Sequence, residues 1–154
     1  PDDYEARANL MWTASWAING FIACGKAGVW SCHPMEHQLS AYYDVTHGHG
    51  LAILTPVWME YILCEKTVDM FVSYGTAVFG ISPQQDKKKI AKEAIRKTRE
   101  LFEAMGLSMT LRSIGITDKS NFEAMAEKAV AGGTEKCFVP LYKQDVINIY
   151  NLCF

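Results

Sequence analysis

The sequence predicts an all-α protein. Apolar residues recur three and four positions apart along most of the chain, which is the spacing of one helix face. There is no series of short segments in which apolar and polar residues alternate, as half-buried strands would require, and there is no internal repeat. The length of 154 residues suits one domain with a buried core. We predict helices over residues 3–24, 32–43, 51–63, 67–79, 86–105 and 143–152, and a further helix that is capped by Asp118 or Ser120 and runs through Ala131.

Asp2 or Asp3 can cap the first predicted helix, because an aspartate side chain accepts hydrogen bonds from free N–H groups at a helix start. The helix runs to about Cys24 and ends at Gly25. It is apolar on most of its faces, with several aromatic residues. We therefore expect it to be well buried.

Ser31 can cap the second predicted helix, which reaches about Tyr43. Residues 44–50 contain two glycines and an aspartate, so we predict a turn-rich loop there. A strongly apolar third helix follows from about Leu51 to Leu63.

Among the later elements, the helix over residues 86–105 has the clearest apolar stripe, and Gly106 ends it. The stripe consists of Ile90, Ala94, Ile95, Thr98, Leu101, Phe102 and Met105. Lysines and arginines between 87 and 99 occupy the rest of the helix. We interpret them as a solvated face, because no aromatic residues accompany them as nucleic-acid binding would favour.

The bulk composition favours an ordinary globular protein, with 49% hydrophobic and 21% charged residues. A net charge of −2 provides no general attraction to nucleic acid or anionic membranes, and no apolar run is long enough to span a bilayer. The five cysteines are scattered, without a C-x-x-C pair, so we expect reduced thiols in a cytoplasmic protein. Residues 1–5 are acidic and polar, unlike a secretory signal.

All four histidines lie between positions 33 and 49, which favours a metal or proton-transfer site. On a helix, His33 and His37 share one face with Cβ atoms about 5–6 Å apart. His47 follows the predicted turn, so its ring could fold back toward His33. Imidazole binds both Fe²⁺ and Zn²⁺, so the ligand type does not select between these metals.

One interpretation takes His33-Pro-Met-Glu-His37 as the H-x-x-E-H motif of inverted zinc proteases. Both histidines would bind zinc, and Glu36 would be the general base. The motif is short, and it needs a third ligand such as Glu60 or Glu65 from another helix.

A longer match supports a second interpretation. The segment Trp30–Tyr61, with Ser-Cys-His-Pro-Met-Glu-His at its start and Thr-His-Gly-His-Gly at its centre, closely resembles the iron-containing alcohol dehydrogenase family. It is most similar to the NAD(P)H-dependent butanol dehydrogenase branch. Residues 1–12 and 106–118 also agree with the family, so the resemblance spans essentially the whole chain.

This resemblance implies a helical C-terminal domain of a dehydroquinate synthase-like fold, in which a divalent metal is bound beside a nicotinamide. His33 and His47 match the two family histidines, fourteen residues apart, that are metal ligands. His37 matches a histidine that lies near both the metal and the nicotinamide, so its implied role is substrate orientation or proton relay. His49 falls where the family varies, which favours a structural or exposed residue.

The chain departs from the family in what it lacks. It has no glycine-rich cofactor loop and no aspartate followed four residues later by histidine, the pair that supplies the family's other two ligands. We therefore expect residues 1–154 to be the all-helical metal-binding domain without the N-terminal Rossmann-like cofactor domain. This expectation fits a chain that opens on proline rather than methionine.

Such a chain should bind Fe²⁺ or Zn²⁺ weakly and should not by itself interconvert butanol-like alcohols and aldehydes with NADH or NADPH. A surface that the cofactor domain would cover should favour a homodimer. The non-enzyme alternative is a helical metal-binding or oligomerisation module without catalysis.

Overall fold

The computed structural model describes residues 2–25, 28 and 30–154, and these residues form helices and connecting segments without any strand. The all-α prediction is therefore confirmed. The loop predicted around residues 26 and 27 lies outside the described residues. The helices are α1 (Tyr4–Ile18), α2 (Cys32–Tyr43), α3 (His47–Tyr61), α4 (Val68–Phe79), α5 (Lys87–Ala104), α6 (Phe122–Ala131) and α7 (Lys143–Cys153).

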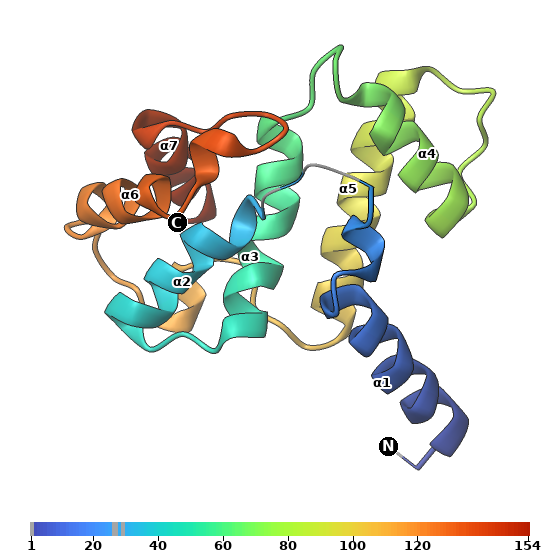
Figure 1. Ribbon diagram of the computed structural model, residues 1–154, viewed down its shortest axis with the longest axis horizontal. Helices are drawn as coiled ribbons and strands as arrows, with labels where there is room; N and C mark the ends of the chain where they lie inside the picture. The colour runs from blue at the N-terminus through green and yellow to red at the C-terminus, as the bar shows by residue number, and fades with distance from the viewer. Residues whose placement is uncertain (1, 26–27, 29) are drawn as a thin grey trace.

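The core lies where α2 and α3 pack against each other and against the C-terminal pair α6 and α7 (Figure 1). α5 packs on α3 and carries α4 on its other side. Tyr150 of α7 is wholly buried, and its hydroxyl donates a hydrogen bond to the Met35 carbonyl of α2 at 2.8 Å. The larger apolar side chains with no exposed surface are Met35, Leu39, Ile53, Leu54, Leu111, Met125, Val146 and Ile149.

The prediction that the first helix is buried is wrong. None of the α1 residues is buried, and Met11 is 74% exposed. Figure 1 shows α1 extending away from the rest of the molecule. Apolar composition around a helix indicates a surface suited to burial, but it does not identify the partner that covers it. The described part of the chain provides no such cover for α1.

The start of α1 agrees with the prediction, but its end does not. Asp3 is the N-cap, and its side chain accepts from the Ala6 N–H at 2.9 Å, as predicted. The helix ends at Ile18 rather than near Cys24. Gly20 has a φ of +87°, a left-handed conformation that glycine adopts without strain, so the chain leaves the helix there.

The third helix begins earlier than predicted, at His47 instead of Leu51, so residues 47–50 form a helical turn and not a loop. Only residues 44–46 connect α2 to α3. Asp44, with a φ of 54°, ends α2, and the Thr46 carbonyl accepts the first helical hydrogen bonds of α3. Glycine disfavours helix in isolation, but tertiary packing outweighs that local preference of under about 1 kcal/mol per residue.

α5 follows its prediction closely. The Asp86 side chain caps it by accepting from the Lys89 N–H at 3.1 Å, and its stripe is buried from Ile90 to Thr98. Beyond that point the stripe emerges, with Met105 64% exposed. No helix in the described ranges is both long and apolar enough to cross a membrane.

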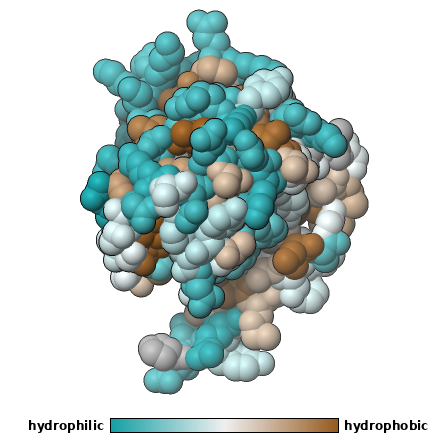
Figure 2. Space-filling model, turned by 90° about the vertical axis from the view of Figure 1, so that its left-hand side faces the viewer, coloured by the Kyte–Doolittle hydropathy of each residue, from teal (hydrophilic) through white to brown (hydrophobic). Residues whose placement is uncertain are grey.

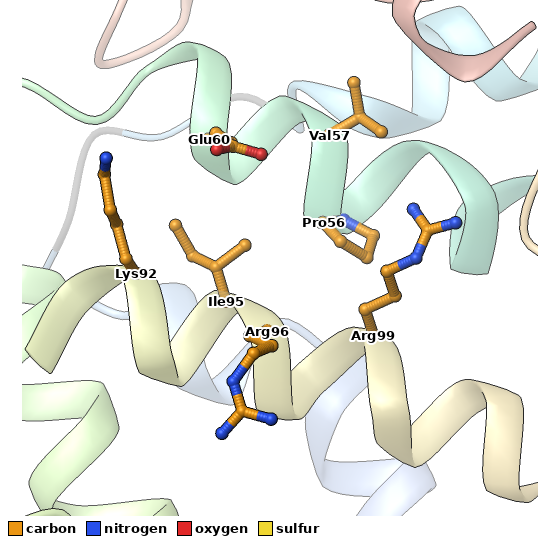
Figure 3. A pocket seen from close by; sticks show the side chains of 7 residues that line it. All are labelled: Pro56, Val57, Glu60, Lys92, Ile95, Arg96 and Arg99. Atoms are coloured by element: carbon orange, nitrogen blue, oxygen red, sulfur yellow. The ribbon is translucent and has the colours of Figure 1, made fainter. Parts of the chain in front are cut away.

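Two of the basic residues of α5, Arg96 and Arg99 (labelled in Figure 3), form local polar contacts. Arg96 forms an ion pair with Glu100. Arg99 donates from Nε to Glu103 at 3.1 Å and from Nη2 to the Met109 carbonyl at 3.3 Å. This pairing agrees with a solvated helix face. The shallow pocket beside them is lined by Pro56, Val57, Glu60, Lys92, Ile95, Arg96 and Arg99.

The outer face seen in Figure 2 is largely hydrophilic, with hydrophobic residues scattered among polar ones. Such scattered apolar residues are normal on a protein surface. The exposed apolar side chains of α1, including Leu10, Met11 and Trp12, are concentrated on one helix instead. α1 therefore presents an exposed apolar surface that another protein segment could cover.

Candidate metal centre

The hairpin of α2 and α3 brings three of the four histidines together. The ring centroids of His33 and His47 are 5.2 Å apart, those of His37 and His47 are 5.4 Å apart, and those of His33 and His37 are 6.0 Å apart. His33 and His37 share a face because they are four residues apart on α2. The short connection at Asp44 then turns the chain so that His47 reaches them, as the sequence predicted.

The rings are partly open to solvent. His33 is half-buried, His37 is exposed, and the His47 side chain retains 48% of its surface. His33 and His37 line an open pocket together with Trp30, whose ring centroid lies 4.1 Å from that of His33. Small molecules can therefore approach the histidines from this side.

Glu36 contacts the histidine group from the protein interior and has no exposed surface. One carboxylate oxygen contacts Nδ1 of His47, and the other accepts from the Ser40 hydroxyl at 2.7 Å. The carboxylate also packs tightly against α3, because a Cβ atom added to Gly50 would lie 2.6 Å from Oε1.

Sequence reasoning considered Glu36 only as a protease base and missed its contact with His47. A signal was present in the sequence. Glu36 falls within the buried stripe of α2, which also contains Cys32, Met35 and Leu39. A carboxylate in such a stripe needs a polar partner, because an unpaired buried charge is costly.

Electrostatics favour neutral imidazole at His33. Its pKa is lowered below the ordinary value by burial, and further by the neighbouring His47 and His37 rings. A neutral imidazole has a free nitrogen lone pair, the form that coordinates metal ions.

The donor set fits a borderline divalent ion such as Fe²⁺ or Zn²⁺. Donor atoms of Glu36, His37 and His47 lie within 4.8 Å of one another. Glu36 is wholly buried and contacts His47, whereas His33, one of the two predicted ligands, is not a member of this donor group. Three side chains from one hairpin still leave a four-ligand site incomplete.

The remaining candidates are placed elsewhere. Nε2 of His49 donates to the Ser108 carbonyl at 2.7 Å, a contact that ties the start of α3 to the segment after α5. Glu60 and Glu65 do not join the donor cluster found among the described residues. The protease interpretation also requires Glu36 to reach water, which its burial prevents.

Comparison with known proteins bears directly on this site. The sequence model of the Fe-containing alcohol dehydrogenase family, C-terminal, matches residues 1–154. The NADH-dependent butanol dehydrogenase A of Clostridium acetobutylicum is 56% identical over 151 residues, and butanol dehydrogenase B of the same organism is 52% identical over 153. Each alignment covers 97% of this chain but only 39% of the relative.

Solved structures agree in fold. The crystal structure of NADH-dependent butanol dehydrogenase A from Thermotoga maritima matches with a TM-score of 0.84 and 34% identity, over 99% of this chain and 40% of that one. The aldehyde reductase YqhD from Escherichia coli matches with a TM-score of 0.88 and 27% identity, over all of this chain and 40% of that one. The chain thus spans about two fifths of the length of these relatives. It belongs to the Fe-containing alcohol dehydrogenase family and corresponds to its helical C-terminal part.

Proposed function

We propose that residues 1–154 are the all-helical metal-binding domain of a metal-dependent alcohol dehydrogenase. The observation that carries the proposal is the convergence of the His33, His37 and His47 rings on one hairpin. The names of the Clostridium relatives support a reaction between small primary alcohols and aldehydes, such as butanol and butyraldehyde. The nicotinamide, NADH or NADPH, would be bound by the rest of the whole protein.

In this proposal His33 and His47 each provide one ligand to Fe²⁺ or Zn²⁺, which would act as a Lewis acid on the alcohol or aldehyde oxygen. His37 is exposed, as is His47, and it lines the open pocket together with His33. It would orient the substrate and the nicotinamide and would relay the hydroxyl proton to solvent. Trp30, stacked edge-on against His33, would form the pocket wall.

A cytoplasmic setting is part of the proposal. All five cysteines are free, and three of them are buried as small core residues. Burial raises the pKa of the Cys32 thiol to about 12, which keeps it in its unreactive protonated form.

The isolated chain is expected to have no dehydrogenase activity, because two or three imidazoles without the cofactor domain cannot position metal, substrate and nicotinamide together. The assay follows NADH or NADPH absorbance with butyraldehyde. A chimera that joins the preceding part of C. acetobutylicum butanol dehydrogenase A to this chain should turn over butyraldehyde. Robust turnover by the isolated chain, or a folded but inactive chimera, would count against the proposal.

The apolar surface of α1 supports a second part of the proposal, that the cofactor domain covers it in the whole protein and that the isolated chain forms homodimers through it. Sedimentation velocity should show association that increases with protein concentration. Leu10→Glu should weaken this association, because Leu10 is 70% exposed on α1. Leu152→Glu is the matched control, since Leu152 is 64% exposed on α7. A monomer at all concentrations would contradict the association, and association without metal binding would favour the oligomerisation-module alternative.

A further inference from the structure

Glu36 is an acidic side chain with no solvent contact in the middle of an apolar helix face. Its neighbours on that face are Met35 and Leu39, both wholly buried. Burying an ion such as a carboxylate costs on the order of several kcal/mol, unless hydrogen bonds within the protein replace those lost to water. An apolar residue would fill this position at less cost, so the carboxylate requires an explanation in its contacts.

One of those contacts is made with His47, the proposed metal ligand on α3, and another with Ser40 on α2. Glu36 Oε2 contacts Nδ1 of His47, and Oε1 accepts from Ser40. A carboxylate accepts hydrogen bonds and does not donate them, so a His47 ring that pairs with it through Nδ1 carries a proton on that nitrogen. The lone pair is then on Nε2, the other ring nitrogen.

We propose that Glu36 is a positioning residue that fixes both the tautomer and the ring orientation of His47, so that Nε2 is free for the metal. The metal-related half of this inference rests on the proposed function. Histidine ligands commonly donate their second ring N–H to a carboxylate, and that partner sets the ring orientation and increases ligand basicity.

Gly50 is a structural requirement of the same arrangement. It lies one helical turn after His47, and an added Cβ would be 2.6 Å from Glu36 Oε1 and 2.8 Å from Cγ. By contrast, a Cβ added to Gly48 meets nothing within 4 Å. The first turn of α3 therefore holds Glu36 between a histidine that it orients and a glycine that makes room for it.

The tautomer can be measured without any metal. Long-range ¹H–¹⁵N NMR spectra of the chain at about pH 8.5, two units above the ordinary histidine pKa, distinguish Nδ1–H from Nε2–H rings. We expect Nδ1–H at His47, assigned with His47→Ala. Glu36→Ala should shift His47 toward the Nε2–H form, and Glu36→Gln should retain Nδ1–H because its amide oxygen still accepts. An Nε2–H ring in the unsubstituted chain, or no change in Glu36→Ala, overturns the proposal.

Zinc affinity, measured by chelator competition, tests the consequence for binding. Glu36→Ala should weaken Zn²⁺ binding by about 10–100-fold, the usual effect of removing such a partner. Glu60→Ala, an exposed glutamate on α3, is the matched control and should leave affinity unchanged. Unchanged affinity in a folded Glu36→Ala variant overturns the positioning role.

The glycines provide a test that leaves every donor group in place. Gly50→Ala should displace the Glu36 carboxylate and weaken zinc binding, whereas Gly48→Ala should not. In a Glu36→Ala background, Gly50→Ala should have no further effect, because the two act through the same contact. Additive effects in the double variant would contradict the proposal. Equal zinc affinity in the unsubstituted chain and in His47→Ala would contradict the proposed metal site. The tautomer spectra would still show whether Glu36 accepts a hydrogen bond from Nδ1 of His47.

Discussion

Alanine at His33 or His47 is expected to reduce the turnover of the chimeric dehydrogenase by at least about 10³-fold, equivalent to about 4 kcal/mol of transition-state stabilisation. Each ring would supply one of four ligands, and a metal site with three protein ligands binds its ion more weakly and in altered geometry. The measurements are kcat with butyraldehyde and metal content by elemental analysis of the same preparations.

His49→Ala is the control for these variants. It removes an imidazole from the same turn of α3, but that ring is bonded to the Ser108 carbonyl and not to the histidine group. We expect a change in kcat of less than about twofold, as for most substitutions away from a site. Full metal content and turnover in His33→Ala or His47→Ala would refute the ligand assignment. Equal losses in all three variants would indicate a general folding defect.

The part of the site that follows from local geometry could be predicted from the sequence. Histidines four residues apart share a helix face, and a short turn returns the chain, so the approach of His47 to His33 required no knowledge of distant residues. Helix caps are similarly local, and Asp3, one of the two aspartates predicted to cap the first helix, is the N-cap of α1.

The features that sequence reasoning missed depend on tertiary contacts. The glycines at 48 and 50 favour a loop when considered alone, yet this turn is helical, and Gly50 packs against Glu36 of α2. The burial of Glu36 follows from its place in the α2 stripe, but its partner is eleven residues away on another helix. The burial predicted for α1 is wrong because the contacts that the described part of the chain makes with this helix leave none of its residues buried.

Tyr150→Ala is expected to lower the free energy of unfolding by about 3–5 kcal/mol, the usual cost of removing a buried aromatic side chain. Tyr150 has no exposed surface, its ring centroid lies 5.3 Å from that of Phe122, and its hydroxyl bonds to the Met35 carbonyl. It therefore connects α7 to α2, the helix that carries His33 and His37. Urea denaturation followed by circular dichroism measures the effect, with Leu152→Ala on the exposed side of α7 as the control.

Tyr150→Phe separates the hydroxyl from the ring. It should cost about 1–2 kcal/mol, because only a buried hydrogen bond is lost. Burial raises the pKa of Tyr150 above its ordinary value. The unfolded chain therefore loses this proton first as pH rises, and the stabilising contribution of the protonated hydroxyl decreases above about pH 10. The difference in stability between the original chain and Tyr150→Phe should shrink over that range. A difference that stays constant would mean that the hydroxyl is not shielded from solvent as the complete burial of Tyr150 requires.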